Sequence, residues 1–173
     1  MLYLKILCSV LVIFAAYLVF RRYAQQQKAG IRLLEEIAND LLTVKSRIVL
    51  EKVPIADIFV GLCVGSSEKV CLYQKIIQRL RGKENCALRE VFVQEAGNME
   101  HLLHMKNKEL EGFVFSADAI EQTDTELCEE CIRSAEAMLK KAADSRREEF
   151  RQRAAMVRGI IFLAAASLCL LIL

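Results

Sequence analysis

The run DTELCEECIRSAEAMLKKAADSRREEFRQRAAMVRGIIFLAAASLCLLIL, residues 124–173, contains a single glycine, Gly159, and no proline. Glycine and proline are the residues that most often interrupt or end a helix. The run therefore predicts one continuous helix of about 75 Å, because an α-helix rises about 1.5 Å per residue. A periodic helix of this length is typical of a coiled coil, a partner helix or a membrane stalk.

The end of this run, residues 159–173, is apolar, and so is most of the beginning of the chain, residues 2–20. Counted from Met156, with Arg158 reaching to the interface, the C-terminal stretch makes a helix of about 27 Å, and residues 2–20 make one of about 28 Å. The hydrocarbon core of a bilayer is about 30 Å thick. We therefore predict an N-terminal transmembrane anchor at residues 1–23, a cytoplasmic helical domain at residues 24–155 and a C-terminal transmembrane segment at residues 156–173.

Arginines flank both predicted spans on the side of the central domain. The membrane-flanking set is Arg21, Arg22, Arg151, Arg153 and Arg158. On the opposite side only Lys5 and the amino terminus are basic, so the positive-inside rule predicts a cytoplasmic central domain with both termini outside the cell membrane. A cleaved signal peptide fits the N-terminus less well, because arginines rather than small residues follow the apolar run.

The composition favours an all-α fold. One proline and seven glycines in 173 residues are too few for a turn-rich β fold. A net charge of +2 gives no nucleic-acid footprint. We expect a membrane-anchored helical bundle with N- and C-terminal transmembrane helices and a long C-terminal stalk helix.

Apolar residues with helical spacing divide the central domain into shorter helices. The predicted core positions are Ile31, Leu34, Ala38, Leu41 and Ile48 in a first helix, Ile55, Ile58, Phe59 and Leu62 in a second, Val70, Tyr73, Ile76, Ile77 and Leu80 in a third, Leu88, Val91, Phe92 and Ala96 in a fourth, and Leu102, Leu103, Leu110 and Phe113 in a less regular stretch at 98–116.

Turn and capping residues predict where these helices begin and end. Pro54 suits the first turn of the second helix, residues 65–67 form a break and Gly82 ends the third helix. Asn85 is expected to cap the fourth helix and Gly97 to end it. Thr123 and Glu126 form a capping box before the long helix.

The pair Cys128 and Cys131 is the sharpest candidate for chemistry. It has the spacing of a redox pair, and it can also bind zinc together with His101 and His104. Packing is the favoured interpretation, since the cysteines begin a seam with heptad spacing that continues through Ala135, Met138 and Ala142. Glu129 and Glu130 also give the thiols an acidic rather than a basic environment.

Motifs for catalysis or nucleotide binding are missing from the sequence. It has no GxxxxGK[ST], GxGxxG or GxSxG pattern. Its two histidines leave a cysteine nucleophile without a suitably placed base. We therefore expect a protein that is not an enzyme and that needs no cofactor.

The layout of the chain resembles the stage III sporulation protein AB family of endospore-forming bacteria. The residues that carry the resemblance are the opening MLYLKIL at 1–7, the pair Arg21 and Arg22, the helix at 31–48, the segment Val53-Pro54-Ile55, the LREVF segment at 88–92 and the charged helix that runs into Arg158 and Gly159. The resemblance implies a membrane component of a secretion-like channel complex on the mother-cell side. Its implied partners are other channel subunits, including a cytoplasmic secretion-type ATPase.

Three functions are compatible with these observations. The first is a non-enzymatic scaffold of that sporulation channel, which docks cytoplasmic and membrane partners. The second is a membrane-anchored helical adaptor unrelated to sporulation. The third is a thiol or metal sensor built on Cys128, Cys131, His101 and His104.

Overall fold

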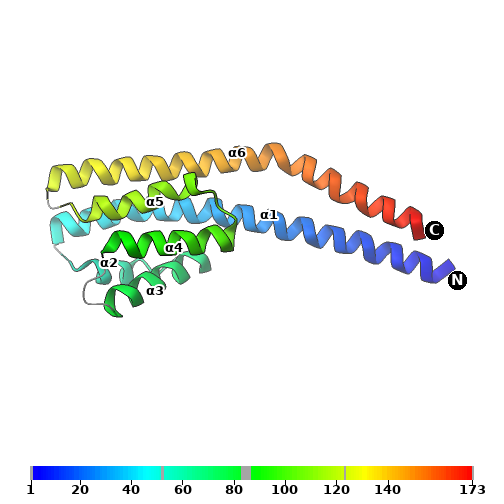
Figure 1. Ribbon diagram of the computed structural model, residues 1–173, viewed down its shortest axis with the longest axis horizontal. Helices are drawn as coiled ribbons and strands as arrows, with labels where there is room; N and C mark the ends of the chain where they lie inside the picture. The colour runs from blue at the N-terminus through cyan, green and yellow to red at the C-terminus, as the bar shows by residue number, and fades with distance from the viewer. Residues whose placement is uncertain (1, 52, 83–86, 123, 173) are drawn as a thin grey trace. The chain divides into compact units, whose positions relative to one another are not determined.

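The computed structural model describes residues 2–51, 53–82, 87–122 and 124–172, with the side chains at 2–9, 49–50, 168–169 and 171–172 excepted. Every secondary-structure element in these ranges is helical (Figure 1). In chain order the elements are α1 (Leu2–Ser46), a π-helical segment (Arg47–Glu51), α2 (Ile55–Gly61), α3 (Ser67–Gly82), α4 (Leu88–Leu103), α5 (Asn107–Ile120) and α6 (Thr125–Ile172). The all-α prediction and the single long C-terminal helix are both confirmed.

The chain divides into two compact units. Residues 29–145 form a helical bundle, and residues 1–28 pack with residues 146–173 as a two-helix hairpin. Both α1 and α6 contribute to each unit. Within the described parts of the chain, no helix combines the length and the hydropathy that identify a membrane-spanning segment.

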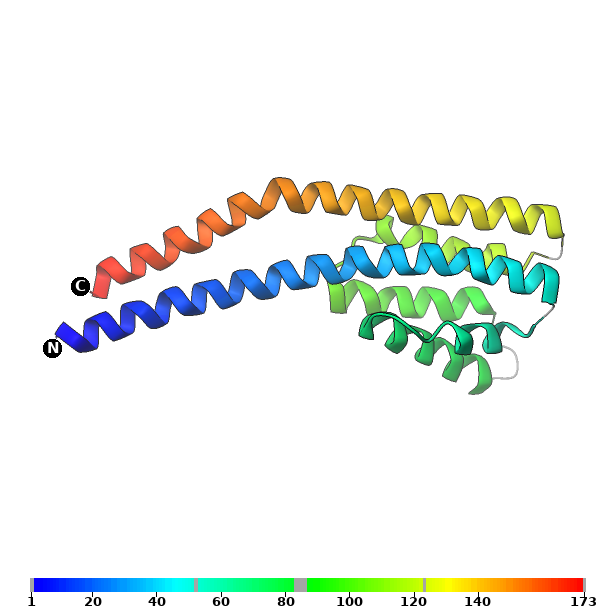
Figure 2. The same ribbon diagram turned by 180° about the vertical axis from the view of Figure 1, so that it is seen from behind.

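The bundle is built around a chain of aromatic rings that joins its short helices. Phe92 of α4 stacks on Phe113 of α5, with ring centroids 4.5 Å apart. Phe59 of α2 contacts both Phe92 and Tyr73 of α3 edge-on, at 5.9 and 5.1 Å. In both ribbon views α1 and α6 run alongside these short helices (Figures 1 and 2). Each aromatic ring buries a large apolar area, and such ring pairs add to the stability of the core.

Most predicted core positions are confirmed. Those at 31–41, 58–62 and 88–96 are buried, and so are Leu103, Leu110 and Phe113. The prediction that Leu102 belongs to the core is wrong, since this residue is 63% exposed. The heptad seam of α6 is partly wrong: Cys128 and Ala135 are buried, but Met138 is 39% exposed. The buried stripe instead runs through Cys128, Ile132, Ala135, Leu139 and Ala143, which face the bundle with the four-three spacing of an α-helix.

Gly97 does not end the fourth helix, which continues to Leu103. Met99 and Leu103 continue the buried face of α4, and their burial outweighs the cost of about 1 kcal/mol for a glycine inside a helix. The helix ends instead at His104, whose backbone takes a left-handed conformation with φ of 49°. The less regular stretch expected at 98–116 is therefore the end of α4, a short turn and most of α5.

Two capping predictions fall on residues 85 and 123, which lie outside the described residues. The N-cap of α4 is Ala87, and the amide of Leu88 donates to the Glu121 carboxylate at 2.7 Å. Helix α6 begins after Asp124, whose Oδ1 accepts hydrogen bonds from the amides of Glu126 at 2.9 Å and Leu127 at 3.4 Å. Aspartate is a strong N-cap residue, so these hydrogen bonds fit Asp124 as a cap of α6.

Candidate functional site

Cys128 and Cys131 of the long helix pack on the bundle. Cys128 is 1% exposed and Cys131 is half-buried. Burial raises the pKa of the Cys128 thiol, and the neighbouring Cys131 and Glu129 raise it further, with Lys45 acting against them. Lys45 lies 2.9 Å from the Glu129 carboxylate. A raised pKa leaves less thiolate, which is the form that reacts and binds metal.

The histidines do not complete a metal site with these cysteines in the described part of the chain. His101 lies near the end of α4 and His104 in the turn that follows, and both are exposed. Among the residues that the structure describes, no three histidine, cysteine or acidic side chains come together as metal ligands. These placements favour the packing interpretation of Cys128 and Cys131.

A polar cluster that the sequence did not single out joins α1 to the turn before α3. Glu36 Oε2 accepts hydrogen bonds from the Ser66 hydroxyl at 2.5 Å and the Ser66 amide at 3.1 Å. Arg32 donates to Oε1 of the same carboxylate at 2.8 Å. Burial alone would raise the pKa of Glu36, but the hydrogen bonds from Ser66 and Arg32 hold it below its usual value. Glu36 therefore stays ionised and fixes the turn.

One turn further along α1, Asp40 accepts from two residues of α3. Lys69 Nζ and the Tyr73 hydroxyl each lie 2.9 Å from its Oδ2. Burial and the Asp40 charge raise the pKa of Tyr73 well above its usual value. Gly65 approaches this cluster with φ of 132°, and a Cβ there would lie 3.0 Å from Lys69 and 3.1 Å from Glu36. Lysines that are buried among apolar residues cannot be recognised from helical periodicity, which is why the sequence missed this contact.

A second buried carboxylate holds α3 against α4. Glu95 is 1% exposed, and its two oxygens accept from Arg79 at 2.8 Å and from Asn98 at 2.9 Å. Removing a partner from such a buried charge is strongly destabilising. Glu95 is therefore best explained as part of the bundle's structure.

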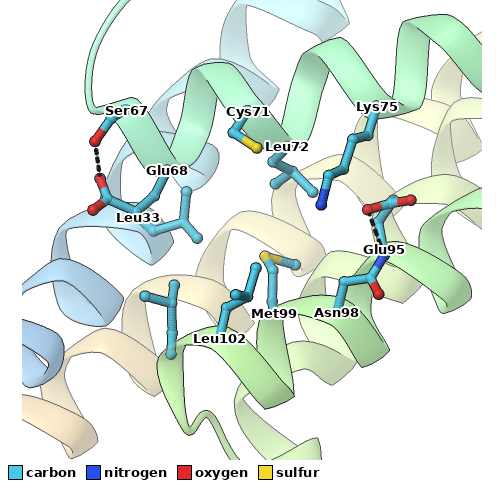
Figure 3. Close-up of a pocket in the computed structure, with 11 residues that line it drawn as sticks. Leu33, Ser67, Glu68, Cys71, Leu72, Lys75, Glu95, Asn98, Met99 and Leu102 are labelled. Carbon is cyan, nitrogen blue, oxygen red and sulfur yellow. Dashed lines mark hydrogen bonds between the residues drawn. The ribbon is translucent and has the colours of Figure 1, made fainter.

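Next to Glu95, a pocket of about 310 Å³ opens between α3 and α4 (Figure 3). Its walls are Leu33, Leu72, Met99, Leu102 and Leu103, and its polar edge carries Ser67, Glu68, Cys71, Lys75, Glu95 and Asn98. Lys75 extends from α3 toward the space between the two helices (Figure 3). An apolar floor with a polar rim is the usual anatomy of a binding surface.

The five arginines predicted to flank the membrane belong to the hairpin unit and are exposed. Arg151 lies 3.4 Å from Glu148, and Arg153 lies 3.8 Å from Glu149. Both pairs lie within one turn of α6, and exposed pairs of this kind contribute at most about 1 kcal/mol.

The described residues thus define an all-helical bundle joined to a hairpin of two long helices. The chain belongs to the stage III sporulation protein AB family, whose family model matches residues 5–173. A role in stage III of sporulation follows from this membership. Comparisons with curated proteins and with solved structures gave no match.

Proposed function

We propose that this protein is a non-enzymatic membrane scaffold of a secretion-like channel complex needed for endospore formation. The hairpin unit would hold it in the cell membrane by two spans. The bundle would lie in the cytoplasm on the mother-cell side and dock a secretion-type ATPase and other channel subunits.

The exposure of large apolar side chains on the hairpin carries this proposal. On α1, the side chains of Val10, Leu11, Phe14 and Val19 are 57–59% exposed. On α6, Met156, Ile160, Leu163 and Leu170 are 60–75% exposed. Soluble proteins rarely expose a contiguous apolar surface of this kind, and lipid or partner helices are its natural environment.

The chemistry of the bundle supports a scaffold over a sensor. The raised pKa of Cys128 disfavours both thiol reactivity and metal binding at that cysteine. The pocket between α3 and α4 offers an apolar surface to a partner segment instead. A thiol or metal sensor remains the competing function, and it needs Cys128 and Cys131.

The continuity of α6 suggests how the scaffold would work. This helix passes from the bundle into the hairpin without an interruption, from Thr125 to Ile172. A continuous helix transmits displacement along its axis, whereas a flexible linker does not. We propose that α6 lets a cytoplasmic partner act on the membrane assembly.

The side of the membrane on which each part of the chain lies tests the proposal. Reporter fusions in an endospore-forming host should read as cytoplasmic after Gly82 and as external after Leu173. Arg151, Arg153 and Arg158 changed together to neutral residues should weaken or invert insertion of the second span. A matched variant with Arg133 and Lys140 neutralised, both in the bundle, should leave it unchanged. An external signal from the fusion after Gly82 would contradict the proposed topology.

A further inference from the structure

The seam of the hairpin unit fixes which positions of its two helices lie level with each other. Tyr23 of α1 contacts Phe150 of α6, with ring centroids 6.2 Å apart. The side chains that are less exposed than their neighbours continue this seam: Val12, Ala16 and Phe20 on α1, and Ala154, Val157, Ile161 and Ala165 on α6. The two segments run side by side with the chain ends together (Figures 1 and 2).

This register places Arg158, just before the apolar run of α6, level with the apolar part of α1. Because the helices are antiparallel, a step back along α1 corresponds to a step forward along α6. Arg158 follows Phe150 by as many residues as Ala15 precedes Tyr23, so Arg158 lies level with Ala15. That level is about 12 Å along the hairpin from the aromatic pair. Arg21 and Arg22 remain near the level of that pair.

Among the hairpin residues that the structure describes, Arg158 has no acidic side chain within reach. The only acidic side chains in residues 1–28 and 146–173 are Glu148 and Glu149. Both lie more than two helical turns before Arg158, whereas side chains on one helix meet at three or four residues' separation. The residues three before and four after it on α6, Ala155 and Phe162, are apolar and exposed. A guanidinium surrounded by apolar side chains needs an anionic partner, because an isolated charge is costly in a low-dielectric medium.

We propose that Arg158 binds the phosphate of an anionic phospholipid, in a site at the boundary between headgroups and acyl chains. This inference rests on the proposed membrane scaffold and adds a lipid partner to it. The planar guanidinium donates two parallel hydrogen bonds to a phosphate, and the flanking apolar side chains pack on the acyl chains. A lipid fits better than free phosphate because it matches both the charge and the apolar surroundings. Arg21 and Arg22 add long-range attraction to the same leaflet.

Native mass spectrometry of the full chain, released from nanodiscs, tests the site. With phosphatidylglycerol the wild type should retain bound lipid, and with phosphatidylcholine it should not. Arg158→Leu should lower phosphatidylglycerol retention severalfold, Arg158→Lys should retain an intermediate amount, and Arg133→Leu, which removes an arginine from the bundle part of α6, should match the wild type.

Three outcomes overturn the lipid site. Equal retention of both lipids by the wild type shows no preference for anionic headgroups. Unchanged retention in Arg158→Leu shows that another group binds the lipid, and loss of a co-purifying membrane protein in that variant would assign the arginine to a partner's carboxylate. Displacement of the lipid by excess inorganic phosphate shows a free-anion site.

Alkaline carbonate extraction of membranes separates the lipid site from the proposed scaffold. A wild-type chain that carbonate strips from the membrane contradicts the scaffold and the lipid site together. A wild-type chain that stays in the membrane but gives any of the three outcomes contradicts the lipid site alone.

Discussion

Lys69 Nζ of α3 lies 2.9 Å from Oδ2 of Asp40 on α1, and the Tyr73 hydroxyl donates to the same oxygen. The side chains of Lys69 and Asp40 are 7% and 16% exposed, so this pair is largely removed from water. The pair, with Glu36 and Ser66 one turn away, connects the long first helix to the short helices. This cluster of four residues and Tyr73 ties α3 to α1, as the Arg79–Glu95 pair ties α3 to α4.

Breaking this pair from one side should be more harmful than removing both partners. Lys69→Met leaves the Asp40 charge buried with only the Tyr73 hydroxyl, at an expected cost of about 3 kcal/mol. Adding Asp40→Asn to Lys69→Met should recover part of that loss, because no unpaired charge remains. Thermal unfolding of the purified full chain measures the stability of the single and the double variant. Equal stability of the wild type and Lys69→Met would show that the pair contributes nothing.

Glu36 should make the bundle sensitive to acid. Its folded-state pKa is lowered from 4.5, so it stabilises the fold above that pH and the contribution is lost as the pH falls below it. Glu36→Gln should therefore lower the melting temperature near neutral pH. In acid, the melting temperatures of the variant and the wild type should lie closer together. Glu68→Gln, on a half-buried carboxylate in the first turn of α3, is the control. A difference that stays constant with pH would contradict the role of the ionised carboxylate.

Two glycines should respond to alanine with opposite signs. A Cβ at Gly112 on α5 would lie 3.0 Å from the Met138 Cβ and 3.2 Å from the Leu139 amide nitrogen of α6. Gly112→Ala should therefore force the two helices apart and cost about 1–3 kcal/mol. Gly97, inside α4, has nothing within 4 Å of that position, so Gly97→Ala should stabilise by about 0.5–1 kcal/mol. Denaturant unfolding gives the free energy of unfolding of both variants. A stabilising effect of Gly112→Ala would contradict the close approach of α5 and α6.

The cysteine pair should matter for packing only. Cys128→Ala combined with Cys131→Ala should cost about 1–3 kcal/mol, most of it from the buried Cys128, and should still restore spore formation in a deletion strain. Heat-resistant spore counts report the function, and melting temperatures report the fold. A stable double variant that forms no spores would support the sensor instead.

Helical periodicity and the positions of glycine and proline were sufficient to predict the all-α fold and the length of α6. They failed where tertiary packing decided a local choice. Gly97 stays helical because Met99 and Leu103 are buried beyond it. Leu139 rather than Met138 is buried, because helix α6 packs on α5 and α1 rather than on one parallel partner.

The polar contacts were beyond the reach of sequence patterns. Lys69 and Glu95 look like solvent-facing residues of amphipathic helices, yet both are buried. Their partners lie on other helices, at Asp40 and Arg79, and such pairings depend on how the helices assemble. The pocket between α3 and α4 was unpredictable for the same reason, since its lining comes from three separate helices.

The continuity of α6 between the bundle and the hairpin is the central claim of the proposed mechanism. The boundary of the two units falls between Ser145 and Arg146. A proline at 142 would kink the helix at a cost of about 3 kcal/mol or more, so Ala142→Pro should abolish spore formation, but it risks unfolding the bundle as well.

An insertion of Gly-Ser after Asp144 is therefore the most direct measurement, because it adds flexibility at the boundary with less damage to either unit. A matched insertion of Ala-Ala at the same place keeps the helix continuous and controls for the added length and rotation. We expect the Gly-Ser variant to reach wild-type levels in the membrane fraction, yet to give far fewer heat-resistant spores than the Ala-Ala variant. Full spore counts with the Gly-Ser insertion would show that α6 is only a tether and would contradict the platform mechanism.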